Sequence, residues 1–83
     1  MEQRARIIFL ETEDCCDILL SKKPYADWRA VAADYPDYKT DLGPWRCETI
    51  IAFFAEEYPK RHFFSEQQIR DFFAGSDTIM YAE

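Results

Sequence analysis

Residues 3–22, with the sequence QRARIIFLETEDCCDILLSK, decide between two fold classes for this chain. No glycine or proline interrupts the segment and most of its residues are good helix formers, which favours one long helix. The apolar stripe of that helix would consist of Ile8, Cys15, Ile18 and Leu19. Glu11 would, however, lie in the middle of this stripe. The alternative is a short strand over residues 6–10 followed by a helix over residues 12–22.

The last residues of the chain bear on the same choice. Residues 78–81, TIMY, could pair with residues 6–10 in a small sheet made of the two terminal segments. A two-stranded sheet is marginal on its own, but packing against helices would stabilise it. We expect a mainly α fold with about four helices, and an α+β fold with this minor sheet is the alternative.

The clearest helix is expected over residues 44–58. Proline suits the first helical position because an N–H has no intrahelical partner there, and Pro44 occupies it. Apolar residues then recur at three- and four-residue steps: Cys47, Ile50, Ile51, Phe54 and Tyr58. Pro59 ends the helix. Phe53 falls outside the stripe, so it is either buried by a neighbouring helix or an exposed contact.

Two more helices are expected, over residues 24–35 and from Ser65 to Gly75. Ser65 and Gln68 form a capping-box pattern, in which the side chain of each residue bonds the backbone N–H of the other. Pro36 and Gly75 mark the two C-terminal ends. The predicted core combines residues from all three helices: Trp28, Ile50, Ile51, Phe54, Ile69, Phe72 and Phe73.

Length and composition exclude several classes of protein. The 83 residues allow one domain, and 48% apolar with 17% aromatic residues exclude a disordered chain. The 16 acidic against 10 basic residues give a net charge of −6, which disfavours direct binding to nucleic acid because phosphates would be repelled. No apolar run approaches the roughly 18 residues of a membrane span, and a signal-peptide pattern is lacking. We expect residues 1–83 to form a single cytoplasmic domain without a membrane partner.

The cysteines and the single histidine do not form a pattern typical of a disulfide framework, a metal site or a catalytic site. Cys15, Cys16 and Cys47 give an odd count, which indicates reduced thiols rather than a disulfide framework. With His62 they could be considered for zinc, but zinc ligands normally come in pairs spaced about two to four residues apart. A catalytic pair of Cys47 and His62 would place the thiol on the predicted core face, where it is inert. No phosphate loop, zinc-protease motif or nucleophile elbow occurs. We expect no metal, no cofactor and no catalytic residues.

Two acidic clusters are the candidate binding features. The first contains four carboxylates within seven residues: Glu11, Glu13, Asp14 and Asp17. Carboxylates at a helix N-terminus complement the helix dipole, so this cluster has an ordinary structural explanation as well as a binding one.

The second cluster lies in residues 34–41, DYPDYKTD, which we expect to be the longest surface loop. Its candidate partner-binding residues are Asp34, Asp37, Tyr38 and Asp41. Carboxylates accept hydrogen bonds from arginine and lysine, and aromatic rings supply rigid contact area. In the alternative interpretation, Tyr35 and Trp45 anchor the loop on the core and Tyr38 is incidental. We take both clusters and Phe53 as the predicted partner-binding residues.

These features predict a small, acidic, non-catalytic protein that binds a protein partner. An inhibitor or adaptor of this kind would occupy a basic surface that otherwise binds nucleic acid. In size, charge and lack of catalytic motifs the chain resembles small phage anti-CRISPR and other anti-defence proteins, and some nuclease immunity proteins, although no motif matches one of these families. The alternative is a small helical regulatory module that acts as a homo-oligomer, such as a homodimer, without mimicry of nucleic acid.

Overall fold

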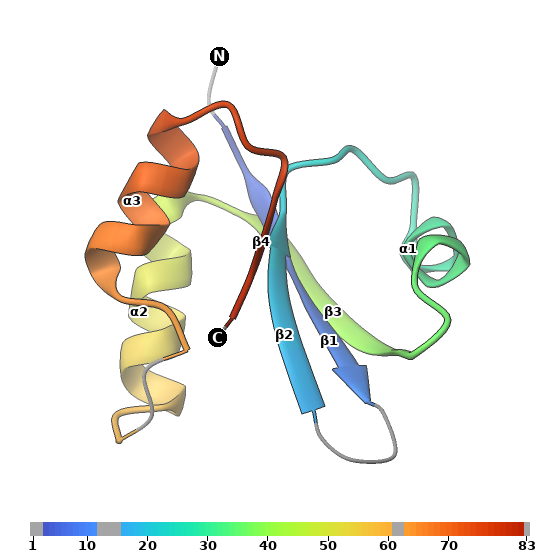
Figure 1. Cartoon of the computed structure of the whole chain (residues 1–83), viewed down its shortest axis with the longest axis horizontal. Coiled ribbons are helices and arrows are strands. Elements are labelled where there is room, and N and C mark those ends of the chain that lie inside the picture. Colours follow the sequence, from blue (N-terminus) through green and yellow to red (C-terminus); the bar gives the residue numbers. More distant parts are fainter. Residues whose placement is uncertain (1–2, 12–15, 61–62, 83) are drawn as a thin grey trace.

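The computed structural model describes residues 3–11, 16–60 and 63–82, which form an antiparallel sheet of four strands with helices on both faces (Figure 1). The elements follow in the order β1 (Ala5–Glu11), β2 (Cys16–Ser21), α1 (Trp28–Asp34), β3 (Tyr38–Trp45), α2 (Cys47–Glu57), α3 (Glu66–Ala74) and β4 (Ile79–Tyr81). The strand order is β3-β1-β2-β4, so β3 and β4 are the edges of the sheet. The fold is α+β, and the expected mainly α fold is wrong.

The largest correction concerns the segment that decides the fold. Residues 6–10 lie in β1, but the expected helix over residues 12–22 is wrong, because β2 pairs antiparallel with β1 along its whole length. Residues 12–15 lie outside the described ranges. The strand at the end of the chain is confirmed, although β4 pairs with β2 rather than with residues 6–10.

Layers on both sides of the sheet explain the continuous apolar runs of β1 and β2. Successive side chains of a strand point to opposite faces. Ile7 and Leu20, which are paired across the two strands, face α2 and α3, whereas the next pair, Ile8 and Leu19, faces α1 (Figure 1). A strand that is buried on both faces needs apolar residues at every position, so its sequence does not alternate.

The larger core lies between the sheet and the α2–α3 pair. Its buried members are Ala5, Ile7, Ile18, Leu20, Ile50, Phe54, Phe64, Ile69 and Phe72. Four residues of the predicted core are therefore confirmed as buried here, and Ile51 and Phe73 pack against them. A smaller core under α1 contains Ile8, Leu10, Leu19 and Val31. Trp28 belongs to neither core and is 56% exposed, so its predicted burial is wrong.

The sequence signal for the start of a helix is confirmed at α3 but is wrong at α2. Both halves of the capping box are present at α3, where Gln68 N–H donates to Ser65 Oγ at 3.0 Å and Ser65 N–H to Gln68 Oε1 at 2.8 Å. Pro44 does not start a helix: it lies in β3 after a cis peptide bond, and α2 begins at Cys47. Gly43 before it has φ +104°, and an added Cβ would lie 3.1 Å from the carbonyl oxygen of Ala5. Glycine is therefore required where β3 passes the start of β1.

No helix within the described ranges is long and apolar enough to cross a membrane.

Candidate functional site

The two acidic clusters predicted from the sequence meet at one end of the sheet. Glu11 ends β1, and its backbone N–H donates to the carbonyl oxygen of Asp37 at 2.9 Å, just before β3 begins. Asp17, on the other side of β1, is paired in register with Leu10. All three acidic residues are exposed. Neighbouring strands lie about 4.8 Å apart, so one carboxylate from each of three adjacent strands spans about 10 Å. Because successive side chains of a strand alternate, Asp17, opposite Leu10, is on the α1 face and Glu11 is on the other face. We call Glu11, Asp17 and Asp37 the acidic end of the sheet.

Lys39 contacts the acidic end. Lys39 Nζ lies 3.4 Å from Glu11 Oε2, and both side chains are more than half exposed. An exposed pair of this kind contributes about 0–1 kcal/mol and is screened by salt. Lys39 therefore lowers the negative charge of the acidic end without fixing Glu11 in place.

A stacked pair of aromatic rings begins at the residue after Asp37. Tyr38 directly follows Asp37, and its ring stacks on that of Trp28 at the start of α1, with centroids 6.5 Å apart and planes inclined by 22°. The Tyr38 ring is half-buried, whereas Trp28 is mostly exposed. Tryptophan and tyrosine are enriched among the residues that dominate protein–protein binding energy. The exposed face of Trp28 is the functional feature that the sequence analysis missed, because the spacing of Trp28 and Val31 resembled a buried helix face.

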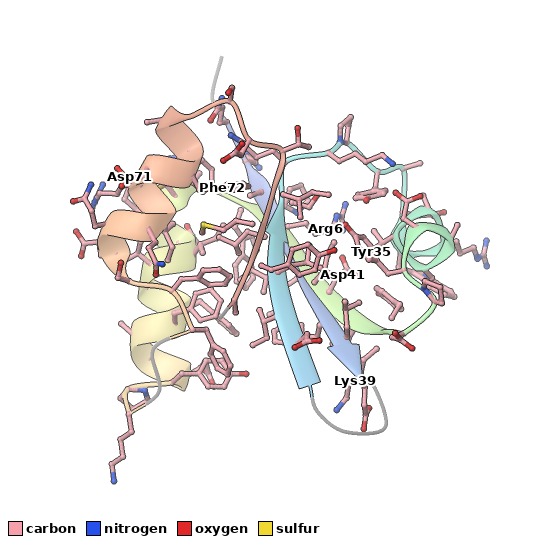
Figure 2. The ribbon with its side chains drawn as sticks, viewed as in Figure 1. Arg6, Tyr35, Lys39, Asp41, Asp71 and Phe72 are labelled. Atoms are coloured by element: carbon pink, nitrogen blue, oxygen red, sulfur yellow. The ribbon has the colours of Figure 1, made fainter. Side chains whose placement is uncertain are left out.

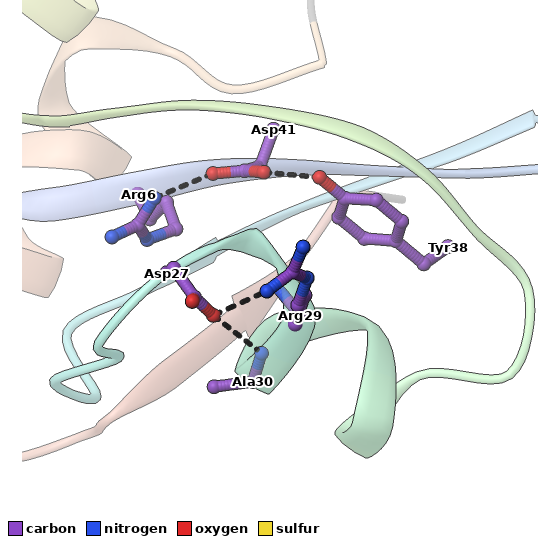
Figure 3. Close-up of polar contacts among 6 residues, drawn as sticks. All are labelled: Arg6, Asp27, Arg29, Ala30, Tyr38 and Asp41. Carbon is purple, nitrogen blue, oxygen red and sulfur yellow. Dashed lines mark hydrogen bonds and ion pairs between the residues drawn. The ribbon is translucent and has the colours of Figure 1, made fainter.

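Asp41, a predicted binding residue, is engaged inside the protein. Its carboxylate accepts a hydrogen bond from Arg6 Nη1 at 2.6 Å, and the Arg6 and Asp41 side chains are 13% and 7% exposed (Figures 2 and 3). The Tyr38 hydroxyl donates to the other carboxylate oxygen of Asp41. The expectation that residues 34–41 form a surface loop is wrong from Tyr38 onward, since Asp41 lies in β3 opposite Ile8.

Asp34 is also bonded within the fold, although it is more exposed. It accepts hydrogen bonds from Lys23 Nζ at 2.5 Å and from the Tyr25 hydroxyl at 2.9 Å. These bonds, that from Lys23 above all, lower the pKa of the Asp34 carboxyl below its usual value. Burial and the bond to Asp34 raise the pKa of the Tyr25 hydroxyl. Asp34 therefore joins the segment before α1 to the end of that helix.

The remaining predicted residues are less informative. Glu13 and Asp14 lie outside the described residues. Phe53 is half-buried and packs against the rings of Trp45, Phe54 and Tyr58, with centroid distances of 5.6, 5.3 and 6.1 Å. These contacts favour a packing role for Phe53, whose aromatic partners lie in β3, in α2 and directly after α2.

The residues considered for metal or thiol chemistry are not assembled into a site. Cys47 is half-buried, and burial followed by the charge of Glu48 raises the pKa of its thiol, which disfavours the reactive thiolate. His62 and Cys15 lie outside the described residues. Among the residues that the structure does describe, no three His, Cys, Asp or Glu side chains are grouped so that they could hold a metal ion.

The hydrogen bond between Tyr38 and Asp41 predicts a dependence of stability on alkaline pH. Burial and then the bond to Asp41 raise the pKa of Tyr38 from 10.0 to about 12. A pKa that is higher in the folded than in the unfolded state stabilises the fold below the unfolded value, and this contribution is lost as the pH rises through the folded value. Between pH 10 and about 12, urea denaturation should therefore show a steeper loss of stability for the parent than for Tyr38→Phe. Parallel curves for the two proteins would contradict the bond.

Comparison with protein-family models, curated proteins and solved structures finds no match for this chain.

Proposed function

We propose that the protein is a non-catalytic inhibitor or adaptor that binds a protein partner through the acidic end of the sheet. The partner's surface would be basic, of the kind that otherwise binds nucleic acid. The observation that supports this most is that Glu11, Asp17 and Asp37, all exposed, lie at the same end of the sheet, near the stacked rings of Tyr38 and the exposed Trp28 that follow from Asp37 on the α1 side. Separate acidic clusters have ordinary explanations, whereas carboxylates gathered at one end of the sheet give that end a concentrated negative charge with aromatic contact area nearby.

The carboxylates and the exposed tryptophan would affect different steps of binding. Carboxylates at the acidic end would accept hydrogen bonds from arginine or lysine and would speed association by attraction over a Debye length of about 8 Å. The exposed face of Trp28 would be buried on binding and would slow dissociation. Trp28 already rests on Tyr38, so little conformational freedom remains for it to lose.

A homodimer is the second candidate, and β4 favours it. This three-residue edge strand carries Ile79 and Tyr81, which are 38% and 57% exposed. Edge strands with exposed apolar side chains can pair with a second copy of the chain. Sedimentation velocity separates the candidates, because a dimer that dissociates in Tyr81→Lys would support the second one.

The test of the first candidate begins with capture of partners from a lysate and their identification by mass spectrometry. The captured partner is then used in binding kinetics with two variants of equal net charge. The first removes the acidic end through Glu11→Gln, Asp17→Asn and Asp37→Asn. The matched control removes three exposed carboxylates elsewhere through Glu48→Gln, Asp71→Asn and Asp77→Asn.

We expect the acidic-end variant to associate about tenfold more slowly than the control at low salt, because charges near the contact govern the association rate. The difference should shrink as salt rises. Trp28→Ala should instead raise the dissociation rate by a factor that corresponds to about 2 kcal/mol, the size of a hot-spot effect.

Equal association rates for the two charge variants would contradict the proposed surface, since only total charge would then matter. Affinity that is insensitive to salt and to both variants, but that collapses in Phe53→Ala, would instead assign binding to the half-buried rings around α2.

A further inference from the structure

The two edges of the sheet differ in their protection against pairing with a further strand. Proteins discourage such pairing with a short edge strand, or with a lysine, a proline or a bulge at the edge. β3 has the last three of these: Lys39 and Pro44 lie in it, and its register with β1 shifts at two places. β4, at the opposite edge, pairs with β2 in continuous register (Figure 1). Over residues 78–82, TIMYA, it has neither a charge nor a proline, so of these four features it has only the short length.

The backbone groups of Ile79 and Tyr81 point to the outer edge of the sheet. In an antiparallel pair, alternate residues direct their N–H and C=O groups toward the neighbouring strand or away from it. Two bonds show which residues of β4 face β2. Ala82 N–H donates to the carbonyl oxygen of Ile18 at 2.9 Å, and the carbonyl oxygen of Thr78 accepts at 2.8 Å from the residue that follows β2. Residues 78, 80 and 82 therefore face β2, and residues 79 and 81 face outward.

The side chains of Ile79 and Tyr81 add apolar contact area to this edge. They are two of the three exposed large apolar side chains among the described residues. Both lie on the α1 face, because Tyr81 is paired with Leu19 of the smaller core and Ile79 with Ser21. Met80 packs on the larger core at the other face. Since residues 78–82 carry no charge, two chains of net charge −6 can approach each other here with little local repulsion.

We propose that β4 pairs with β4 of a second copy in one defined register, with Ile79 opposite Tyr81 of the second copy. The inference rests on the homodimer, the second candidate function, and specifies its geometry. In an antiparallel pair around a two-fold axis, this register alone places both outward residues of β4 opposite outward residues of the other β4. Each such pair exchanges both of its backbone hydrogen bonds. The Ile79 side chain then lies beside the Tyr81 ring of the second copy, as an aliphatic–aromatic cross-strand pair.

Met80 lies at the two-fold axis in this register. Residue 80 of one copy is opposite residue 80 of the other, in a pair without mutual hydrogen bonds whose Cα atoms lie about 4.5 Å apart. This distance suits a disulfide bond, which joins residues with Cα atoms about 4.4–6.8 Å apart. Thr78 lies opposite Ala82 of the second copy, so the two Thr78 residues are about 14 Å apart along strands that rise about 3.4 Å per residue. Cross-linking can therefore report the register.

The test is oxidation of Met80→Cys and Thr78→Cys in the full chain, followed by peptide mapping with mass spectrometry. The parent, whose three native cysteines stay in place, gives the background. We expect Met80→Cys to form a dimer linked through residue 80, and Thr78→Cys to remain at the background level. A mixture of Thr78→Cys and Ala82→Cys should be linked between residues 78 and 82, which tests the register without changing Met80. Absence of both linkages would overturn the proposal.

Sedimentation velocity distinguishes failure of the register from failure of the dimer. A dimer of the parent without either linkage would overturn the register but retain the second candidate, whereas a monomer at every concentration would overturn both. Ile79→Lys should weaken the dimer at least about tenfold, because each copy would bring a charge to the edge. Thr40→Lys adds the same charge to β3 and should leave the dimer intact. Equal weakening by the two variants would overturn the assignment to β4.

The effect of salt separates this dimer from binding at the acidic end. Each copy has a net charge of −6, so higher salt should strengthen the dimer by screening the repulsion between the copies. Association of a basic partner with the acidic end should instead weaken as salt rises. A dimer that dissociates at high salt would be held by ion pairs rather than by the uncharged edge, and this result would overturn the proposal.

Discussion

Phe54→Ala is expected to destabilise the protein by about 3–5 kcal/mol, which approaches the whole stability of many small domains. Phe54 is 6% exposed and lies where α2, the segment before α3 and the sheet meet. Its ring contacts other aromatic rings, with centroids 5.3 Å away at Phe53, 5.4 Å at Phe64 and 6.0 Å at Tyr58. Truncation would remove these contacts and leave a cavity that the surrounding rings cannot close.

Phe53→Ala is the matched control for this prediction. It removes the same ring from the next position of the same helix, but Phe53 is only half-buried, so we expect a loss of about 1–2 kcal/mol. Urea denaturation followed by circular dichroism measures both values. A Phe54→Ala protein that melts within a degree or two of the parent would show that Phe54 does not hold the larger core together.

The helices that pack on the larger core could be predicted because their signals are local. Ile50 and Phe54 recur at helical spacing in α2, and both are buried as predicted. The capping box of Ser65 and Gln68 needs only residues within one turn, and both of its bonds are present. The prediction that Pro44 begins a helix was wrong because the fixed φ of proline suits both a helix start and an edge strand. The close approach of Ala5 to Gly43, which depends on strand pairing, decides between the two.

The central strands could not be predicted in the same way, because their burial depends on layers far away in the sequence. Ile7 faces α2 and α3 while its neighbour Ile8 faces α1, so β1 reads as a continuous apolar run without period. Such a run is compatible with a buried helix or a buried strand. The leucines of β2 are good helix formers in isolation, and pairing with β1 overrides that preference.

In the candidate site, too, single residues could be predicted from the sequence, but their partners in distant strands could not. The sequence indicated Glu11 and Asp37 as acidic positions, but their contact depends on the pairing of β1 with β3. Asp41 looked like its neighbours in a polar segment, and nothing within that segment shows that Arg6, 35 residues away, would be its partner.

Asp41→Ala is expected to destabilise the protein by about 3 kcal/mol, the lower end of the range for removing one partner of a buried ion pair. The substitution would leave the charge of Arg6 largely buried without its carboxylate, and it would also remove the acceptor of the Tyr38 hydroxyl. The lower end applies because the Arg6 side chain is still 13% exposed and lines a surface cavity, so water stabilises part of the remaining charge. Chemical denaturation at neutral pH measures the loss.

A double-mutant cycle with Arg6→Met separates the ion pair from the packing of the two side chains. Removal of both charges leaves no buried ion uncompensated, so the double variant should be more stable than the sum of the two single losses predicts, by about 2 kcal/mol. The pair Lys23 and Asp34 provides the control, because a similar contact between exposed side chains should give a coupling of about 0.5 kcal/mol. Coupling energies of equal size in the two cycles would show that the Arg6–Asp41 pair behaves as a surface contact. A larger value for Arg6 and Asp41 would establish that the carboxylate of Asp41 joins β3 to β1 and is not available to a partner.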